Sequence, residues 1–69
     1  MVNVNLLKAE TIKRGYKDRD IAEKALKISP QAYAKKLKRI TKITTDDADS
    51  ICAFLGIEDR TLKADIFLA

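Results

Sequence analysis

Two short helices joined by a turn are predicted by the stretch from Asp18 to Lys42, which reads DRDIAEKALKISPQAYAKKLKRITK. In residues 18–26 the apolar residues recur at helical spacing and charged residues fill the other positions, as in an amphipathic helix. Asp18 or Asp20 can accept hydrogen bonds from the free backbone N–H groups of its first turn. Residues 27–29 then form a turn of the length that joins the two helices of a helix-turn-helix.

The second helix of this stretch, residues 30–39, has a clear start signal and two different faces. Ser29 is placed to cap it, and Pro30 suits the first helical position, where a missing N–H group costs nothing. Tyr33 and Leu37 form its apolar face, with Ile40 next in line. The opposite face is polar and basic, with Gln31, Lys35, Lys38 and Lys42. One face is expected to pack into a core and the other to meet a negatively charged partner.

Length and composition predict a single all-α domain. A chain of 69 residues has room for one domain, residues 1–69, and its two glycines and one proline favour helices joined by short turns. We expect a compact bundle of four to five short helices. No apolar run has the length of a membrane span, and the N-terminus lacks the apolar segment of a signal peptide. A cytoplasmic protein without membrane contact is therefore expected.

The side chains that most catalytic and metal sites need are scarce in this chain. There is one cysteine, Cys52, and no histidine, which excludes an internal disulfide and the usual zinc sites. The same scarcity removes every pairing of a serine or cysteine nucleophile with a histidine base. We expect no catalytic residues, no metal, no cofactor and no small-molecule ligand. An enzyme is the least favoured of the functions considered.

Charge is unevenly distributed along the chain. The formal net charge is +4, yet residues 30–43 contain five cations and no acid, while residues 44–69 contain six acids and two cations. A basic face on one short helix, backed by an acidic remainder, is typical of proteins that bind a polyanion. The alternative is a solvated lysine-rich face, which is common on helices.

The first helix is predicted over residues 2–14. Asn3 or Asn5 can cap it, and Gly15 can end it in the left-handed conformation. Tyr16 is expected to fold back over its apolar stripe and pack in the core with a solvated hydroxyl. The residues predicted to form that stripe are Val4, Leu7 and either Thr11 or Ile12.

Two further helices are predicted after the motif, following a connection over residues 40–44. Thr45 or Thr44 caps the first, Gly56 ends it, and its core face contains Ala48, Ile51, Cys52 and Leu55, with Phe54 on the flank. We interpret Cys52 as a small buried apolar residue. Glu58 or Asp59 caps the last helix, which contains Leu62, Ile66, Phe67 and Leu68. Ile66 and Phe67 either pack on the first and fourth helices or contribute to a dimer contact, and both can hold.

One set of residues, spread over nearly the whole chain, forms a pattern known from other proteins: Ile21-Ala22-Glu23-Lys24, Leu26, Ile28-Ser29, Tyr33, Leu37, Phe54-Leu55-Gly56-Ile57 and Ile66-Phe67-Leu68. In this pattern the chain resembles the lambda-repressor-like helix-turn-helix domains, in particular small phage repressors and related transcriptional regulators. The resemblance implies the fold of that family, a motif over residues 18–39 and a recognition helix over residues 30–39 that enters the major groove of double-stranded DNA.

The sequence departs from the family pattern in several places. The family usually has one residue fewer between Ala22 and Ile28, so the first motif helix is expected to be longer or to end differently. Lys27 replaces the usual turn glycine and would have to take a left-handed conformation. Asp18 replaces a glutamine that often contacts phosphate, so Lys17 or Arg19 would have to supply that contact. Lys38-Arg39 stands where the family often has Asn-Gly.

Carried over residue by residue, the resemblance implies a set of DNA contacts. Gln31 could pair with an adenine edge, and Lys35 with guanine or a phosphate. The expected base contacts are Ser29, Pro30, Gln31, Ala34 and Lys35. The expected phosphate contacts, which position the domain without reading sequence, are Lys17, Arg19, Lys36, Lys38, Arg39, Thr41 and Lys42.

These observations leave two principal hypotheses. The favoured one is a sequence-specific DNA-binding regulator, expected to be a repressor that binds its operator as a homodimer. The alternative is a protein-interaction module, such as an antitoxin or antirepressor, that uses the same helical fold to bind a protein. The departures at Asp18 and Lys27 and the apolar C-terminus support this alternative.

Overall fold

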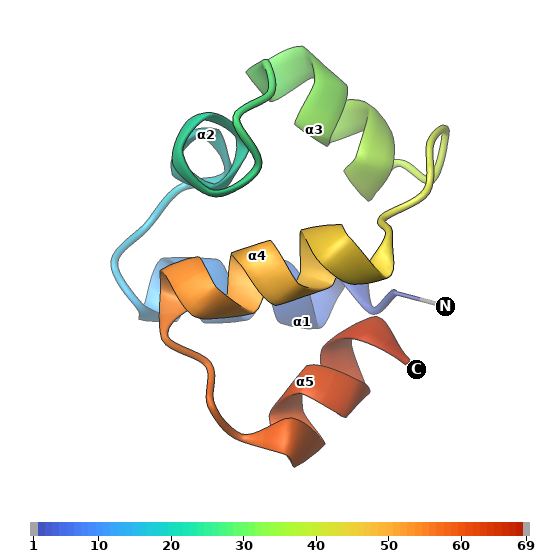
Figure 1. Cartoon of the computed structure of the whole chain (residues 1–69). Helices are drawn as coiled ribbons and strands as arrows, with labels where there is room; N and C mark the ends of the chain where they lie inside the picture. Colours follow the sequence, from blue (N-terminus) through green and yellow to red (C-terminus); the bar gives the residue numbers. More distant parts are fainter. Residues whose placement is uncertain (1, 69) are drawn as a thin grey trace.

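A computed structural model describes residues 2–68, and its elements follow one another along the chain as α1 (Val4–Lys13), α2 (Asp18–Asp20), η1 (Ile21–Leu26), α3 (Pro30–Leu37), α4 (Thr45–Leu55) and α5 (Arg60–Phe67) (Figure 1). Because α2 continues directly into the π-helical turn η1, the described residues form five helices, and none of them belongs to a strand. The prediction of a compact all-α bundle of four to five short helices is confirmed.

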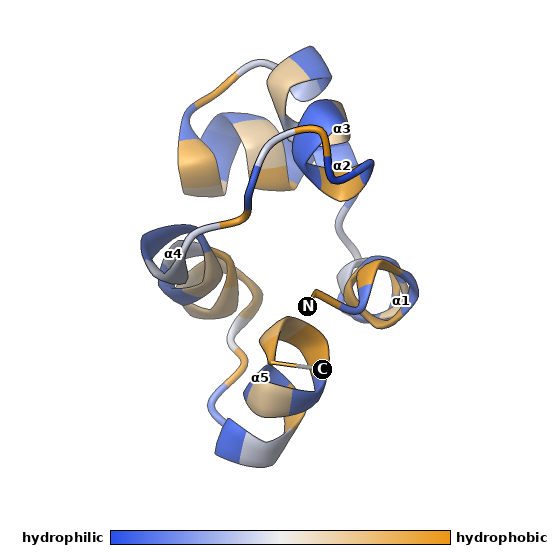
Figure 2. Cartoon of the chain, turned by 90° about the vertical axis from the view of Figure 1, so that its right-hand side faces the viewer, coloured by the Kyte–Doolittle hydropathy of each residue, from blue (hydrophilic) through white to orange (hydrophobic). Residues whose placement is uncertain are grey.

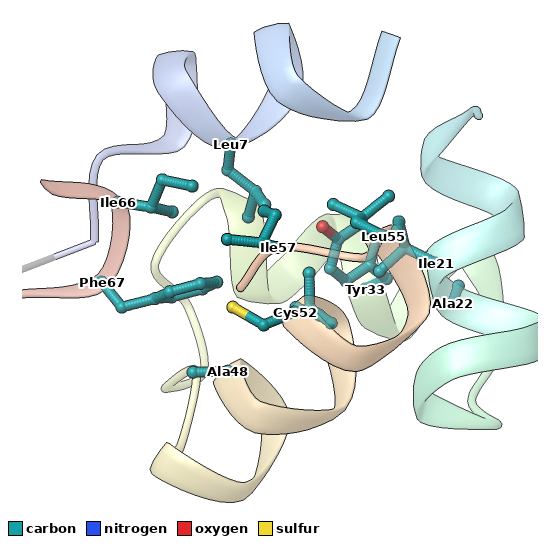
Figure 3. Close-up of a cluster of buried hydrophobic side chains, with 11 residues drawn as sticks. Leu7, Ile21, Ala22, Tyr33, Ala48, Cys52, Leu55, Ile57, Ile66 and Phe67 are labelled. Atoms are coloured by element: carbon teal, nitrogen blue, oxygen red, sulfur yellow. The ribbon is translucent and has the colours of Figure 1, made fainter. Parts of the chain in front are cut away.

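The helices are arranged around one core. In both views, the pair formed by α2–η1 and α3 lies at one end of the molecule and α5 lies at the other, with α1 and α4 between them (Figures 1 and 2). Helix α4 packs against η1, and α5 packs against α1. The residues that fill the core are Leu7, Ile21, Ala22, Tyr33, Ala48, Ile51, Cys52, Leu55, Ile57, Ile66 and Phe67 (Figure 3).

Helix α1 is shorter than the predicted range of residues 2–14. The side chain of Asn3 accepts a hydrogen bond from the backbone N–H of Leu6 at 3.1 Å, so Asn3 is the cap and the helix begins at Val4. Gly15 has a φ of 86° and ends it, as predicted. Thr11 is fully buried, its hydroxyl donating to the carbonyl of Leu7 at 2.8 Å, whereas Ile12 is 73% exposed. Only one of these neighbouring positions can face the core, and Thr11 occupies it.

For each of the last two helices the structure selects one of the two predicted caps. Thr44, rather than Thr45, caps α4, and Gly56 ends it with a φ of 77°. Asp59 caps α5, its carboxylate accepting from the N–H groups of Thr61 and Leu62. Tyr16 is partly buried against the core, as expected, and its ring lies 4.7 Å from that of Phe54 between centroids.

Ile66 and Phe67 pack against the rest of the domain. Ile66 and Phe67 are buried, and the carbonyl of Ile66 accepts a hydrogen bond from the N–H of Asn3 at 2.6 Å. Intramolecular docking of these two residues is thus confirmed. Leu68, in contrast, is 80% exposed.

Candidate nucleic-acid interface

The two motif helices meet at a turn whose geometry comes from a π-helical segment. The carbonyl of Ala22 accepts hydrogen bonds from the backbone N–H of Lys27, five residues ahead, and from that of Ile28 at 2.8 Å. A π turn takes up one residue more than an α turn. The helix that contains Ala22 therefore ends in a turn that holds one residue more than a regular α turn would. Lys27 takes the left-handed conformation with a φ of 57°.

Helix α3 is held at its start by a cap and along its length by one large aromatic side chain. The hydroxyl of Ser29 accepts from the N–H of Ala32 at 3.1 Å, and Pro30 fills the first helical position, as predicted. Tyr33 is 1% exposed and lies beside Leu55 and Ile21 in the core (Figure 3). This anchoring fixes which face of α3 meets solvent.

The hydroxyl of Tyr33 is buried, and no hydrogen-bond partner for it lies within residues 2–68. Burial, together with the negative charge of Asp18, raises the pKa of this hydroxyl well above its ordinary value. The phenol is therefore neutral throughout the physiological range, and Tyr33 acts as an anchor for α3.

Helix α3 ends earlier than the predicted residue 39. Its last residue is Leu37, and the backbone then reverses through Arg39, which has a φ of 64°. The carbonyl of Lys35 accepts from the N–H of Ile40 at 2.9 Å, and that of Lys36 from the N–H of Arg39 at 3.1 Å, which is the Schellman pattern of a helix end. Ile40 consequently leaves the helical register and is 68% exposed, so its expected place on the buried face is wrong.

The five residues predicted to contact bases lie together on one short segment. Ser29, Pro30, Gln31 and Lys35 are exposed, and Ala34 is half-buried. Gln31 and Lys35 are one helical turn apart, so their side chains occupy the same face. Helix α3 lies at one end of the molecule (Figure 1).

The residues predicted to contact phosphate fall into two groups along the chain, one at the start of α2 and one at and after the end of α3. Lys17 and Arg19 are exposed at the start of the first motif helix, and Arg19 Nε donates to Glu23 Oε1 at 2.8 Å. The second group, in and after the last turn of α3, contains Lys36, Lys38, Arg39, Thr41 and Lys42. Of this group only Lys36 is not exposed.

Lys36 has a partner inside the protein. Its Nζ lies 2.9 Å from Asp47 Oδ2 and donates to the carbonyl of Lys42 at 3.0 Å, and its side chain is 19% exposed. Burial opposes ionisation of Asp47, but the hydrogen bonds from Lys36 and Thr44 outweigh it and lower the pKa of this carboxyl. Lys36 therefore ties α3 and the following loop to α4. A phosphate contact by Lys36 stays a prediction, because the ammonium group of Lys36 is already bound to Asp47 and to the carbonyl of Lys42.

Two features of this surface were not singled out from the sequence. The Lys36–Asp47 ion pair joins residues that no helical periodicity relates, so residue spacing could not reveal it. Lys27 was noted only for its backbone conformation. It is exposed in the turn just before Ser29 and adds a cation beside the start of α3. The sequence signal for this residue is that Lys27 replaces the turn glycine that the lambda-repressor-like domains usually have.

Lys35, Lys38 and Lys42 are exposed on this surface. Within residues 2–68, no carboxylate lies within ion-pair distance of any of the three.

No helix in the described part of the chain is long and apolar enough to cross a membrane, and no group of three potential metal-ligating side chains is found there. Comparisons with protein-family models, with curated proteins and with solved structures find no match.

Proposed function

We propose that this protein binds double-stranded DNA sequence-specifically, as a lambda-repressor-like helix-turn-helix regulator that occludes a promoter. The observation that carries the proposal is the solvent face of α3, on which Gln31 and Lys35 stand one turn apart while Tyr33 anchors the opposite face. A rigid helix with exposed amide and ammonium groups can present them to base edges in a major groove.

The local backbone geometry supports the same proposal. Lys27 and Arg39 take left-handed conformations at the two positions where the family usually has glycine. The π turn η1 absorbs the residue by which the chain exceeds the family spacing. The departures in sequence are thus compatible with the turn geometry that a helix-turn-helix requires.

The DNA complex is proposed to be dimeric. A single domain with a few phosphate contacts binds weakly at physiological salt, because each neutralised phosphate contributes a salt-dependent share of the affinity. Two copies on half-sites about 34–36 Å apart, or a multiple of that distance, would provide useful affinity. No cofactor takes part in this binding mode.

Selection from random duplex DNA at near-physiological salt tests the proposal. We expect enrichment of a palindrome, and we expect Gln31→Ala to lower the preference for one base pair by about 1–3 kcal/mol. Lys35→Ala should weaken binding and relax the preference at a neighbouring position. The matched control is Lys8→Ala, which removes an exposed cation from α1. If Gln31→Ala and Lys35→Ala bind and select DNA as the control does, α3 is not the reading helix.

A further inference from the structure

A groove with an apolar floor lies where the N-terminal segment, the loop after α3 and the end of α5 meet. Figure 2 looks onto this side of the molecule, with the loop at the top and α5 at the bottom. Two adjoining hollows of about 320 Å³ and about 580 Å³ share the residues Val2, Ile43, Thr44, Thr45 and Phe67. Leu68, Ala64 and Ala48 extend the floor along α4 and α5, and Leu68 is among the most exposed large apolar side chains.

The charged side chains along this groove all have the same sign. They are Lys36, Arg39 and Lys42 at the end near α3, and Arg60 and Lys63 at the end near α5, and none of the described residues that line the two hollows is acidic. Lys36 is paired with Asp47, and Lys63 with Asp49. Within residues 2–68, Arg39, Lys42 and Arg60 have no carboxylate within ion-pair distance. Three uncompensated cations therefore border an apolar floor.

We propose that this groove binds an acidic, apolar peptide segment of a partner protein. The apolar floor would take leucine- or phenylalanine-like side chains, and the cations at the two ends would pair with acidic side chains on the same segment. Apolar contact supplies affinity and the two cationic ends fix the position of the segment.

Charge argues against a second copy of this chain as the occupant. The groove face of α5 contains Arg60, Lys63, Ala64 and Phe67, so a symmetric pairing of two such faces would bring cations of both copies together. Each copy also carries a formal net charge of +4. Like charges across an interface disfavour association, whereas an acidic segment meets only opposite charge.

Binding in the groove should compete with DNA, and this part of the inference rests on the proposed function. Arg39, Thr41 and Lys42 line the groove and are also predicted phosphate contacts. A segment that engages these three residues occupies groups that the DNA backbone would use. The partner would thus release the regulator from its operator.

The test is a titration of the purified protein with a fluorescent peptide of about 12 residues that contains Leu, Phe and Glu. These residues are spaced to form an amphipathic helix, which would be about 18 Å long. One control peptide replaces each Glu with Lys, and another replaces each Leu and Phe with Ser. We expect micromolar binding of the first peptide and at least about tenfold weaker binding of both controls, since charge and apolar contact both contribute.

Protein variants locate the binding site. Ala64→Glu, in the groove, should weaken peptide binding about tenfold, and Arg60→Glu about fivefold, because each places a negative charge against the acidic segment. Thr61→Glu is the matched control: it makes the same charge change as Ala64→Glu on the same helix, at an exposed position that does not line the groove. Circular dichroism confirms that all three variants are folded.

The outcomes separate this inference from the proposed function. Equal binding of the Glu and Lys peptides, no binding of the Glu peptide at millimolar concentration, or equal effects of Ala64→Glu and Thr61→Glu would overturn the groove assignment. So would a concentration-dependent dimer that Ala64→Glu dissociates, because the occupant would then be a second copy. Loss of operator binding when the peptide is added supports competition, and an unchanged operator affinity refutes it. Peptide binding by a protein that binds no DNA leaves the groove assignment in place and refutes the proposed function.

Discussion

Lys27 and Arg39 occupy backbone positions that favour glycine. Both have φ values near 60°, where a β-carbon crowds the backbone, and each follows the last residues of a motif helix. Both side chains are exposed, so neither contributes apolar packing that would offset this strain. A lysine or arginine in such a place adds positive charge to the surface beside α3. The backbone conformation of these two residues thus lowers the stability of the motif, while their side chains add positive charge to its surface.

Replacing Lys27 with glycine should stabilise the protein. The left-handed conformation is less costly for glycine, and we expect the free energy of unfolding to rise by about 1 kcal/mol, net of the extra freedom of glycine in the unfolded chain. Urea unfolding at pH 7 measures the change. Lys24→Gly, in the preceding π turn, is the control and should destabilise. A decrease in stability for Lys27→Gly would show that the lysine side chain makes a stabilising contact.

Tyr33 combines a well-packed ring with a buried hydroxyl that has no partner within residues 2–68. Tyr33→Phe keeps the ring and removes the hydroxyl, so we expect the free energy of unfolding to rise by about 1 kcal/mol at pH 8. Because burial and the charge of Asp18 raise the pKa of this hydroxyl in the folded protein, its titration leaves the stability of the wild type unchanged below pH 10 and lowers it as pH rises above that unfolded-state value.

Chemical unfolding at pH 8 and pH 11 tests both statements about Tyr33. The stability advantage of Tyr33→Phe should be larger at pH 11, because only the wild-type unfolded chain gains from ionising this tyrosine. A substitution that destabilises the protein at pH 8 would mean that the hydroxyl has a hydrogen-bond partner after all.

At the scale of the helices, the structure confirms those helix starts and ends that were predicted from a capping residue or a glycine beside them. Gly15, Gly56, Ser29 and Asp59 act on groups within a few residues of themselves, and each ends or caps the helix that it was expected to end or cap. The end of α3 at Leu37 could not be read in the same way. Arginine is not a residue type that favours the left-handed conformation, so the apolar spacing predicts a helix through residue 39 with Ile40 next on its buried face.

The π turn and the Lys36–Asp47 pair were unpredictable for a different reason. The position of an extra hydrogen-bonded residue within η1 depends on how Ile21 and Ala22 pack against α4, which local spacing does not encode. The ion pair joins two elements that only the complete fold brings together. Of the candidate site, the exposed face of α3 was predictable because one helical period determines it.

Asp47 stabilises the junction between α3 and α4 through charge. Its carboxylate accepts from the N–H of Thr44 at 3.1 Å and pairs with Lys36 at 2.9 Å. Asp47→Asn keeps the shape and an acceptor but leaves the half-buried ammonium of Lys36 without its counter-ion. We expect the free energy of unfolding to fall by about 1 kcal/mol at pH 7. Because the pKa of Asp47 is lowered in the folded protein, this difference should disappear as pH falls below about 4.

Unfolding experiments on the single and double variants isolate this pair. In a Lys36→Met background the same Asp47→Asn change should have a smaller effect, since no ammonium is left unpaired. Additive effects of the two substitutions would show that the pair does not contribute to stability.

For the whole molecule, the uneven charge would orient the domain towards the DNA of the proposed complex. The cations of residues 30–43 gather around α3 and the following loop, while most acids lie on the α4 and α5 side, where Asp47 and Asp49 neutralise two of the lysines. The net charge of +4 alone does not distinguish cations that are free at the surface from lysines that are paired with an acid inside the protein. Lysines that lie close together in the sequence would therefore differ in what they contribute to the proposed DNA binding.

Lys36 and Lys38 provide a matched comparison of this kind. They are two residues apart at the end of α3, but Lys38 is exposed and Lys36 is bound to Asp47. Lys38→Ala should reduce the magnitude of the slope of log K against log salt for operator DNA by about 0.9, the value of one phosphate contact. Lys36→Ala should leave that slope nearly unchanged while lowering the thermal stability, because its charge is already compensated within the protein. Fluorescence anisotropy across a salt series gives both slopes, and equal slopes for the two variants would mean that Lys36 leaves Asp47 to contact phosphate when DNA binds.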